Sequence, residues 1–423
     1  MGANAMRAII LISILMILPA SCAWVPDIKQ VPGVVLGEAS FYPTIAAHTD
    51  APIIGGNKLE LLFNGDEIFP AMIRAIRGAR RSITYAQYLY EDGPIAHEMA
   101  EVLAERCRAG LTVKLLIDSH GGGKMPKEIP ELWKSSGCDL QWFRRIQLFQ
   151  FITPWELFSY NYRNHRRVLV IDGEIGFTGG HGVKHTWTGN GRTENHWRET
   201  DVRVEGPIVQ QLQAAFVESW RQTTGHMLGD DLFFPALRPR GKSYAQVVKS
   251  SPFGGTHQSY LLFILAITAA RKSIYITNPY FVPDERLIEE LLNAVQRGVR
   301  VVVLGPGKID WMLVYRASRR GFGTLLKGGI EIFEYQPALL HAKTMVVDGV
   351  WALVGTTNLD NRSFALNEEI NLIAYDTEAA GQLEKVFLED LRYAKKLDYE
   401  SWKARPLGEK IMELFTIPIK DHL

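Results

Sequence analysis

Two histidines stand at matched places in the chain, and each is followed two residues later by a cation: His165 by Arg167, and His341 by Lys343. Each pair opens an apolar run that is typical of a β-strand. Because side chains alternate faces along a strand, each histidine and its cation should point the same way. Imidazole titrates near neutral pH and can act as nucleophile, acid or base, while a cation beside it can hold anionic oxygens. The two pairs therefore predict acid–base and nucleophilic chemistry next to bound negative charge.

Each apolar run ends in an Asp-Gly pair, which begins at Asp172 in the first motif and at Asp348 in the second. An Asp-Gly pair between two apolar runs predicts a two-residue hairpin turn. That turn would place Thr356 opposite His341, with Asn358 on the same face of the sheet. The two aspartates fall on the opposite parity, so we interpret both as structural residues of the turns.

The elements that must position these motifs occur twice. Strand-like and helical segments alternate at 83–88, 96–108 and 112–117 in the first copy, and at 274–277, 287–297 and 299–304 in the second. Such alternation predicts α/β units around a largely buried sheet. We therefore predict an α/β fold of two similar halves, each with a mixed β-sheet flanked by helices, packed as a pseudo-dimer with one shared active site.

Changes in composition suggest how the chain is divided. The expected segments are a signal peptide at 1–22, a linker at 23–56, a first domain at 57–230, a linker at 231–256, a second domain at 257–400, and an amphipathic C-terminal tail at 401–423. Within the first domain, the stretch 142–162 is dense in aromatic residues. It suits either a buried wall or contact with acyl chains at a membrane surface.

Composition and charge restrict the possible functions. The chain has 423 residues, of which 47% are hydrophobic and 22% charged, so disorder, collagen and coiled coil are excluded. The formal net charge of +1 argues against non-specific nucleic-acid binding, which requires many phosphate contacts. The three cysteines, Cys22, Cys107 and Cys138, are too few for a disulfide framework and lack metal-site spacing. Pairing between Cys107 and Cys138 stays open.

The amino terminus has the layout of an export signal. Arg7 precedes an apolar run at 8–18, and small residues lead to Cys22 and Ala23. The run is shorter than the ~20 residues that span a bilayer as a helix. Two routes stay open: lipidation at Cys22, which we prefer, and cleavage after Ala23. We expect an exported, membrane-associated protein, on the periplasmic side or as an outer-membrane lipoprotein, with inner-membrane anchoring by an uncleaved N-terminal segment as the alternative.

The second motif reads His-x-Lys, four residues, Asp, six residues, then Gly-Thr-Thr-Asn, and this spacing resembles the signature of the phospholipase D superfamily. Within the superfamily the chain most resembles the bacterial cardiolipin synthases, over about residues 57–415. The matching stretches are 164–172 with 179–180, 197–207, 278–284, 341–369 and 402–407. The first motif departs from the pattern, because it carries Arg167 in place of lysine and Gly182 in place of asparagine.

The resemblance implies phosphodiester exchange through a covalent phosphohistidine. One histidine attacks phosphorus, and the other protonates the departing alcohol and then activates the incoming one. Two cations hold the phosphate oxygens, and neither a metal nor a cofactor is expected. The implied catalytic residues are His165, Arg167, His341, Lys343 and Asn358, and Gly355 joins the two turn aspartates as a structural residue.

The same resemblance points to two acceptors that hold the far nitrogens of the histidines. These are Glu199 for one histidine and Glu369 for the other, with Glu368 as the adjacent alternative.

Other residues with chemical potential have plainer interpretations. His181, His185 and His196 include a spacing that zinc sites also use, but they lie in a Gly/Thr/Asn-rich segment without a matching cysteine, so we expect a surface loop. The glycine run after His120 could approach a phosphate through its backbone amides, and a plain turn is the alternative.

These observations predict a membrane-associated phosphatidyltransferase that makes cardiolipin from phosphatidylglycerol, with phosphatidylethanolamine as a second candidate substrate. One alternative is a hydrolase of the same superfamily, either a phospholipase D or an exported nuclease, although the balanced charge speaks against nucleic acid. The other alternative is a catalytically silent lipid-binding protein, which Arg167 and Gly182 suggest. The sequence predicts no oligomeric state.

Overall fold

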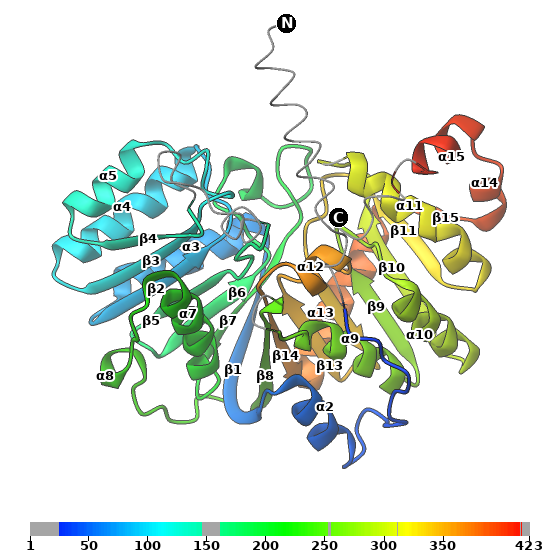
Figure 1. The fold of residues 1–423 in the computed structure, drawn as a ribbon, viewed down its shortest axis with the longest axis horizontal. Helices are drawn as coiled ribbons and strands as arrows, with labels where there is room; N and C mark the ends of the chain where they lie inside the picture. The colour runs from blue at the N-terminus through cyan, green and yellow to red at the C-terminus, as the bar shows by residue number, and fades with distance from the viewer. Residues whose placement is uncertain (1–24, 146–160, 253–254, 311, 415, 417–423) are drawn as a thin grey trace, which may run out of the picture.

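The computed structural model describes residues 25–145, 161–252, 255–310, 312–414 and 416. In this part of the chain, 15 strands form one mixed sheet with helices packed on it, arranged as two similar halves (Figure 1). The predicted α/β fold of two repeated halves is confirmed. The expected signal peptide at 1–22, with Cys22, lies outside the described residues.

The elements of the first half follow the predicted alternation. Its strands are β1 (Ile53–Phe63), β2 (Ser82–Gln87), β3 (Thr112–Asp118), β4 (Asp139–Phe143), β5 (Val168–Ile171), β6 (Ile175–Gly179) and β7 (Thr200–Glu205). Its helices are α3 (Asn64–Gly78), α4 (Pro94–Arg108), α5 (Glu128–Ser135), the 3-10 helix η2 (His185–Trp187), α7 (Val209–Thr224) and α8 (Asp230–Phe233).

The second half repeats this plan and adds elements at its end. Its strands are β8 (Ser243–Ser250), β9 (Ser273–Thr277), β10 (Arg300–Pro306), β11 (Glu331–Tyr335), β12 (Thr344–Val347), β13 (Trp351–Gly355), β14 (Glu369–Tyr375) and β15 (Ala394–Leu397). Its helices are α9 (Gln258–Ala269), α10 (Glu285–Gln296), α11 (Met312–Lys327), α12 (Asn361–Ala365), α13 (Thr377–Leu391), α14 (Tyr399–Lys403) and α15 (Leu407–Leu414).

The two halves have the same strand order. From the centre outward the first runs β1-β7-β6-β5-β2-β3-β4 and the second runs β8-β14-β13-β12-β9-β10-β11, with β15 at the outer edge. The outer strands β2, β3 and β4 are parallel, as are β9, β10 and β11. The hairpins β5-β6 and β12-β13, which follow the two motifs, are antiparallel, and β1 pairs with β8 where the halves meet.

Apolar packing explains why the halves form one body. One apolar cluster lies under α3 and α4 and another under α9 and α10, but a third joins the two halves beneath α7 and α13. This shared cluster includes Phe216 and Val204 from the first half, and Phe387 and Leu372 from the second. Separating the halves would expose this apolar surface to water, at a free-energy cost of roughly 25 cal/mol per Å².

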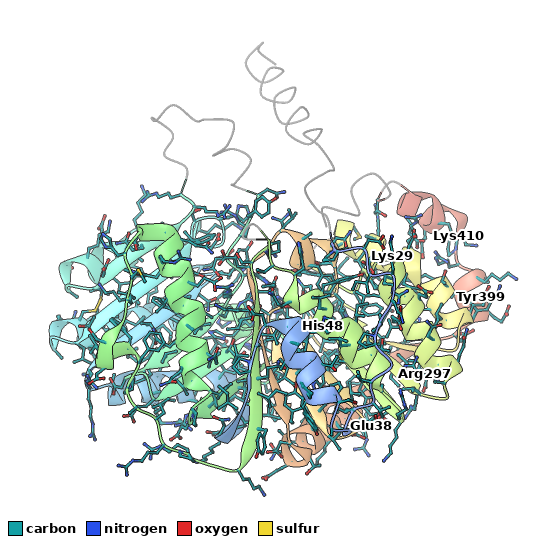
Figure 2. All side chains as sticks on the ribbon, turned by 60° about the horizontal axis from the view of Figure 1, so that its bottom comes forward. Lys29, Glu38, His48, Arg297, Tyr399 and Lys410 are labelled. Atoms are coloured by element: carbon teal, nitrogen blue, oxygen red, sulfur yellow. A yellow bond between two sulfur atoms is a disulfide. The ribbon has the colours of Figure 1, made fainter. Side chains whose placement is uncertain are left out.

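The segment 25–52 differs from the expected linker. It includes helix α2 (Phe41–Thr49), whose Phe41 and Ile45 are buried in the apolar cluster of the second half. Figure 2 shows α2, which carries the labelled His48, lying on the second half. The helix was missed because its few apolar residues lie in a background rich in Pro and Gly.

The hairpin loops after the two motifs contain three residues rather than two. Val347 pairs with Trp351, which leaves 348–350 as the loop, and the first-half hairpin has the same length. The predicted two-residue turn is therefore wrong, and the register moves by one residue, so Thr356 does not lie opposite His341.

The turn aspartates account for the longer loops. Asp172 accepts hydrogen bonds from the backbone amides of residues 80–82 at 2.8–3.2 Å, and Asp348 accepts from those of residues 271–273 at 2.7–3.0 Å. These bonds draw each loop over the start of β2 or β9. Both aspartates adopt positive φ angles, of 55° and 54°, which the short Asp side chain tolerates.

A disulfide joins Cys107, at the end of α4, to Cys138, just before β4, with the two Cα atoms 5.3 Å apart. The pairing that the sequence left open is therefore present in the structure. The second half contains no cysteine. The two halves thus differ in covalent reinforcement.

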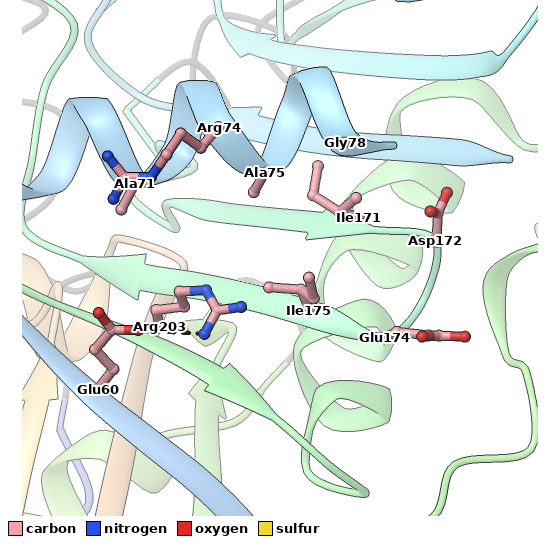
Figure 3. A pocket seen from close by; sticks show the side chains of 10 residues that line it. All are labelled: Glu60, Ala71, Arg74, Ala75, Gly78, Ile171, Asp172, Glu174, Ile175 and Arg203. Atoms are coloured by element: carbon pink, nitrogen blue, oxygen red, sulfur yellow. Dashed lines mark hydrogen bonds and ion pairs between the residues drawn. The ribbon is translucent and has the colours of Figure 1, made fainter. Parts of the chain in front are cut away.

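A cavity of about 410 Å³ opens between α3 and the strands β1, β5, β6 and β7 (Figure 3). Its charged lining residues are Glu60, Arg74, Asp172, Glu174 and Arg203. Several of these side chains are already engaged within the protein: Arg203 pairs with Glu60, and Asp172 holds backbone amides. Neither motif histidine lines this cavity.

Candidate active site

Each motif histidine is hydrogen-bonded to the half of the molecule that is not its own. His165 and His341 each lie three residues before a strand, β5 and β12 respectively. The His165 amide donates to the carbonyl of Glu368 at 2.9 Å, and the His341 amide donates to that of Arg198 at 2.8 Å. Both histidines are buried, at 8% and 5% exposure. Each therefore sits at the junction between the halves.

A glutamate from the other half holds each imidazole ring. His165 Nδ1 lies 3.0 Å from both carboxylate oxygens of Glu369, and His341 Nδ1 lies 2.7 Å from Glu199 Oε2. Both glutamates are fully buried. A carboxylate at Nδ1 orients the ring and keeps the proton there, so that Nε2 presents its lone pair.

The neighbouring Glu368 faces away from the histidines. Its carboxylate accepts from the Ser219 hydroxyl at 2.9 Å and lies 3.7 Å from Arg166. Successive side chains of an extended segment point to opposite faces, which separates Glu368 from Glu369. Of these two adjacent glutamates, only Glu369 contacts a motif histidine through its carboxylate, whereas Glu368 does so only through its backbone carbonyl.

Each histidine has the cation of its own motif beside it. Arg167 Nη2 lies 3.2 Å from His165 Nε2. Lys343 Nζ lies 3.0 Å from both ring nitrogens of His341 and donates to the His341 carbonyl at 2.6 Å. In each half a nucleophilic nitrogen and a positive charge thus face the same space, which suits an anionic group bound next to Nε2.

Burial lowers the pKa of both histidines, so both rings are neutral near pH 7. For His341 the pKa falls to about 4, because Lys343 adds to the effect of burial while Glu199 opposes it. For His165, burial lowers the pKa and Glu369 opposes the change. Lys343 also lowers the pKa of His165, and Arg167 that of His341. The four groups therefore lie close enough to interact across the two halves.

The two cations respond differently to burial. The pKa of Lys343 falls to about 7, mainly through burial and against the pull of Glu199. Burial also lowers the pKa of Arg167, but a guanidinium remains charged at neutral pH. Burial alone would raise the pKa of Glu199, yet His341 and Lys343 hold it at about 2. The site therefore contains one permanent cation and one that titrates.

Asn358 and Gly182 occupy equivalent places after β13 and β6. The side chain of Asn358 is buried, and its Oδ1 has no hydrogen-bond partner among the described residues. A Cβ on Gly182 would come within 3.0–3.1 Å of the Trp187 ring. The indole therefore occupies space next to Gly182.

Gly355 is also needed for close packing, because a Cβ there would lie 2.2 Å from Asn371 Oδ1.

Three aromatic side chains that the sequence did not single out contact the histidines. Trp187 meets His341 edge to face with ring centroids 5.0 Å apart, and Trp197 stacks on the same ring at 5.6 Å. Tyr88 meets His165 at 4.9 Å. Trp197 lies in a stretch that matches the family, and Tyr88 is the last residue of a predicted strand, so the sequence carried some signal for both. Trp187 lies in a Gly/Thr/Asn-rich segment and carried none.

The three histidines with zinc-like spacing, His181, His185 and His196, do not form a metal site among the described residues. His181 is buried, and its Nδ1 pairs with Asp201 on β7, so the expected surface position is wrong for this residue. Its place two residues after β6 carries it into the interior, where Asp201 provides a polar partner. His185 is exposed and His196 is half-buried. Across the described ranges, no three His, Cys, Asp or Glu side chains cluster in a way that could hold a metal ion.

The glycine-rich turn after β3 is organised by Asp118. Its carboxylate accepts from the backbone amides of His120 at 2.8 Å and Gly121 at 3.3 Å. Because these amides are already bonded, the arrangement fits a turn rather than a phosphate cradle.

The aromatic stretch 142–162 is only partly described, because residues 146–160 lie outside the described residues. At its two ends Phe143 and Tyr162 are buried, and the Arg144 guanidinium lies over both rings.

Within the part of the chain that the structure covers, no helix has the length and apolar character to cross a bilayer.

The two fused α/β halves bring together a pair of histidines, each with a carboxylate and a cation, and this arrangement suits nucleophilic chemistry on an anionic group. The family described as "Cardiolipin synthase, PLD-like domain" matches residues 72–220 and 263–391. The chain therefore belongs to the phospholipase D superfamily and to this family within it. It is an enzyme of the phosphatidyltransferase and phosphodiesterase class, which confirms the resemblance drawn from the sequence.

Individual relatives agree with this assignment. A cardiolipin synthase from Geobacillus kaustophilus is 34% identical over 364 residues, which cover 86% of this chain and 72% of the relative. One from Listeria monocytogenes is 34% identical over 359 residues, covering 84% and 73%. The phosphatidylserine synthase of Haemophilus influenzae shares the fold, with a TM-score of 0.65 at 14% identity, over 90% of this chain and all of that one.

Proposed function

We propose that the protein is a phosphatidyltransferase that converts two molecules of phosphatidylglycerol into cardiolipin and glycerol. The observation that carries the proposal is the cross-held histidine pair: His165 on Glu369 and His341 on Glu199, each with Nε2 close to a cation. Relatives named cardiolipin synthases support the choice of lipid.

The reaction takes two displacement steps at phosphorus. Nε2 of one histidine attacks the phosphorus of phosphatidylglycerol, and the bond to the glycerol oxygen breaks as the other imidazolium gives that oxygen its proton. The enzyme then carries a phosphatidyl group on histidine, and glycerol leaves. The second imidazole, now neutral, takes the proton from the hydroxyl of another phosphatidylglycerol, whose oxygen attacks phosphorus as the phosphorus–nitrogen bond breaks. With water as the acceptor, the product is phosphatidic acid.

Charge balance supports this sequence of steps. Arg167 and Lys343 offset the two buried glutamates, and they would stabilise the phosphoryl oxygens during both displacements. A bound phosphodiester adds a negative charge, which raises the pKa of a nearby imidazole and favours the imidazolium that acts as the acid. We assign Asn358 the role of an amide donor to the phosphate.

The test is a product assay with the purified full-length protein. Vesicles of phosphatidylglycerol, with and without phosphatidylethanolamine, are incubated with wild-type protein and with His341→Ala, and the lipids are identified by mass spectrometry. The proposal predicts cardiolipin and an equal amount of glycerol from the wild type alone. Phosphatidic acid without cardiolipin would favour the hydrolase, and no turnover with any of these lipids would favour the silent lipid-binding protein.

We further propose that the mature protein is exported and held at a membrane by lipid attached to Cys22. Support comes from the signal-like residues before Cys22 and from the Cys107–Cys138 disulfide, a bond that persists in oxidising compartments. Cys22→Ser should abolish the lipid adduct in the intact mass and release part of the protein from membranes. A wild-type mass without lipid would overturn the lipidation and leave the catalytic proposal untouched.

A further inference from the structure

The carboxylates that hold the two histidines are themselves held in different ways. In the second half, Thr356 directly follows β13, and its hydroxyl donates to Glu369 Oε2. Asn367 adds a bond to Glu369 Oε1 at 3.3 Å. In the first half, the residue that directly follows β6 is Gly180, which has no side chain to donate. A Cβ there would lie 2.5 Å from Glu199 Oε1, so even alanine would crowd the carboxylate.

An indole supplies the missing donor in the first half. Trp187 Nε1 donates to Glu199 Oε2 at 3.1 Å, and the same oxygen lies 2.7 Å from His341 Nδ1. The other oxygen, Oε1, accepts from the Thr200 amide at 3.0 Å. Trp187 is only 2% exposed, so this bond is shielded from water. The hydrogen bond therefore takes the place that the Thr356 hydroxyl has in the other half.

The same tryptophan also packs against the histidine that Glu199 holds. Its ring meets His341 edge to face, and it lies 4.2 Å from the ring of Trp197, which stacks on His341. A Cβ at position 182 would lie 3.0–3.1 Å from the Trp187 ring, so glycine at this position leaves the indole more room. Gly182, which replaces the asparagine of the family pattern, provides no polar side chain. In its place, the rings of Trp187 and Trp197 pack against His341.

Building on the proposed function, we propose that Trp187 is a positioning residue for His341, acting through the carboxylate of Glu199 and through the face of its ring. An oxygen that accepts two donors attracts the imidazole proton less strongly than one that accepts a single donor. Removing the indole N–H should therefore strengthen the bond that His341 Nδ1 donates to Glu199 and raise the affinity of the histidine for a second proton. It should also loosen the carboxylate that orients the ring.

The test compares Trp187→Phe with a matched control, Trp133→Phe. Both changes remove the N–H of a fully buried indole in the same half, but Trp133 Nε1 donates to the carbonyl of Ala100, away from the site. We expect Trp187→Phe to lower kcat about tenfold, the equivalent of a single modest hydrogen bond, with little change in KM. We expect Trp133→Phe to keep the wild-type kcat.

A second readout requires no turnover. The pKa of the His341 ring, measured by NMR on full-length protein labelled at histidine, should rise by about half a unit or more in Trp187→Phe and stay constant in Trp133→Phe. If the wild-type protein makes no cardiolipin but Trp187→Phe still shifts the pKa of His341, the positioning role is upheld while the proposed function fails. Equal kcat and equal His341 pKa in the two variants would overturn the positioning role.

A third variant separates the N–H from the ring if Trp187→Phe does not fold. Benzothienylalanine at position 187 keeps the bicyclic shape and has sulfur in place of the N–H. It should reproduce the shift in the pKa of His341. An unchanged pKa in this folded protein would show that Trp187 only fills space.

Discussion

The two halves share one topology but differ in the chemistry around their motifs. Corresponding places hold Arg167, Gly180, Gly182 and the His181–Asp201 pair in the first half, and Lys343, Thr356, Asn358 and the Thr357–Asn371 pair in the second. The strand order is nevertheless the same from the centre outward. The fold therefore tolerates polar substitutions at the strand ends, where the site is built.

This difference indicates that the groups around the histidines are assembled from both halves together, and not within each half separately. Glu199 serves the histidine of the second half, and Glu369 serves that of the first. A donor lost at Gly180 can thus be replaced by any group that reaches the same carboxylate, as Trp187 does. Both halves keep a held carboxylate and a cation beside the histidine. The halves need not match.

The largest effect should come from removing either histidine. His165→Ala and His341→Ala should each lower turnover by at least about a thousandfold while the fold remains intact, because a shared site needs nucleophile and acid together. Circular dichroism and thermal unfolding check the fold, and product formation checks the activity. A variant that kept about half of the wild-type turnover would show that each half works on its own.

The next effect concerns the glutamates. Glu199→Gln and Glu369→Gln should each reduce kcat by about ten- to a hundredfold, because an amide holds the imidazole less well in the productive tautomer. Glu368→Gln is the matched control: it changes a buried neighbour whose carboxylate accepts from Ser219 rather than from a histidine, and should lower stability with little effect on kcat. A larger loss of kcat in Glu368→Gln than in Glu369→Gln would reverse the assignment.

A smaller effect, on the pH dependence of activity, should distinguish Lys343 from Arg167. In the free enzyme, kcat/KM should fall as pH rises through about 7, because Lys343 then loses the proton that makes it a cation. Lys343→Arg should move this alkaline limb to higher pH, since a guanidinium stays charged. Arg167→Lys should keep or raise activity at pH 6 and steepen the alkaline limb.

Two results would contradict the pH prediction. An alkaline limb that stays in place in Lys343→Arg would mean that another group controls it. Complete loss of activity in Arg167→Lys would mean that the first half depends on the shape of the guanidinium and not only on its charge.

The smallest effect on activity, with a clear effect on stability, should come from the disulfide that only the first half carries. Replacing Cys107 and Cys138 together by serine should lower the free energy of unfolding by about 3–4 kcal/mol, because the 31-residue separation is no longer constrained in the unfolded chain. Turnover at 25 °C should be unchanged. Urea unfolding monitored by tryptophan fluorescence measures the difference, and an unaltered midpoint would show that the bond adds no stability.

Much of the architecture could be predicted from periodicity and repetition. Alternating strand and helix patterns on both sides of Gly225–Gly255 gave the two α/β halves, and the fold class is confirmed. The loop length after each motif could not be predicted, because it depends on bonds from Asp172 and Asp348 to backbone amides some 75–90 residues away in sequence. The domain bounds at 57–230 and 257–400 stay predictions.

The site shows the same limit. The histidine and cation pairs were readable because their spacing is local and repeated. Trp187 was not, because its role depends on space left by Gly182 and on a carboxylate brought close by folding. Contacts of this kind arise between segments whose spacing carries no periodic signal.

The most direct test of a single shared site counts the covalent intermediate. Wild-type protein is mixed with phosphatidylglycerol labelled in its phosphate, quenched within one turnover in alkali, which preserves phosphohistidine, and digested for mass spectrometry. We predict at most one labelled histidine per chain, always the same one of His165 and His341. Two labels on one chain, or equal labelling of both positions, would contradict a site in which one histidine attacks and the other moves the proton.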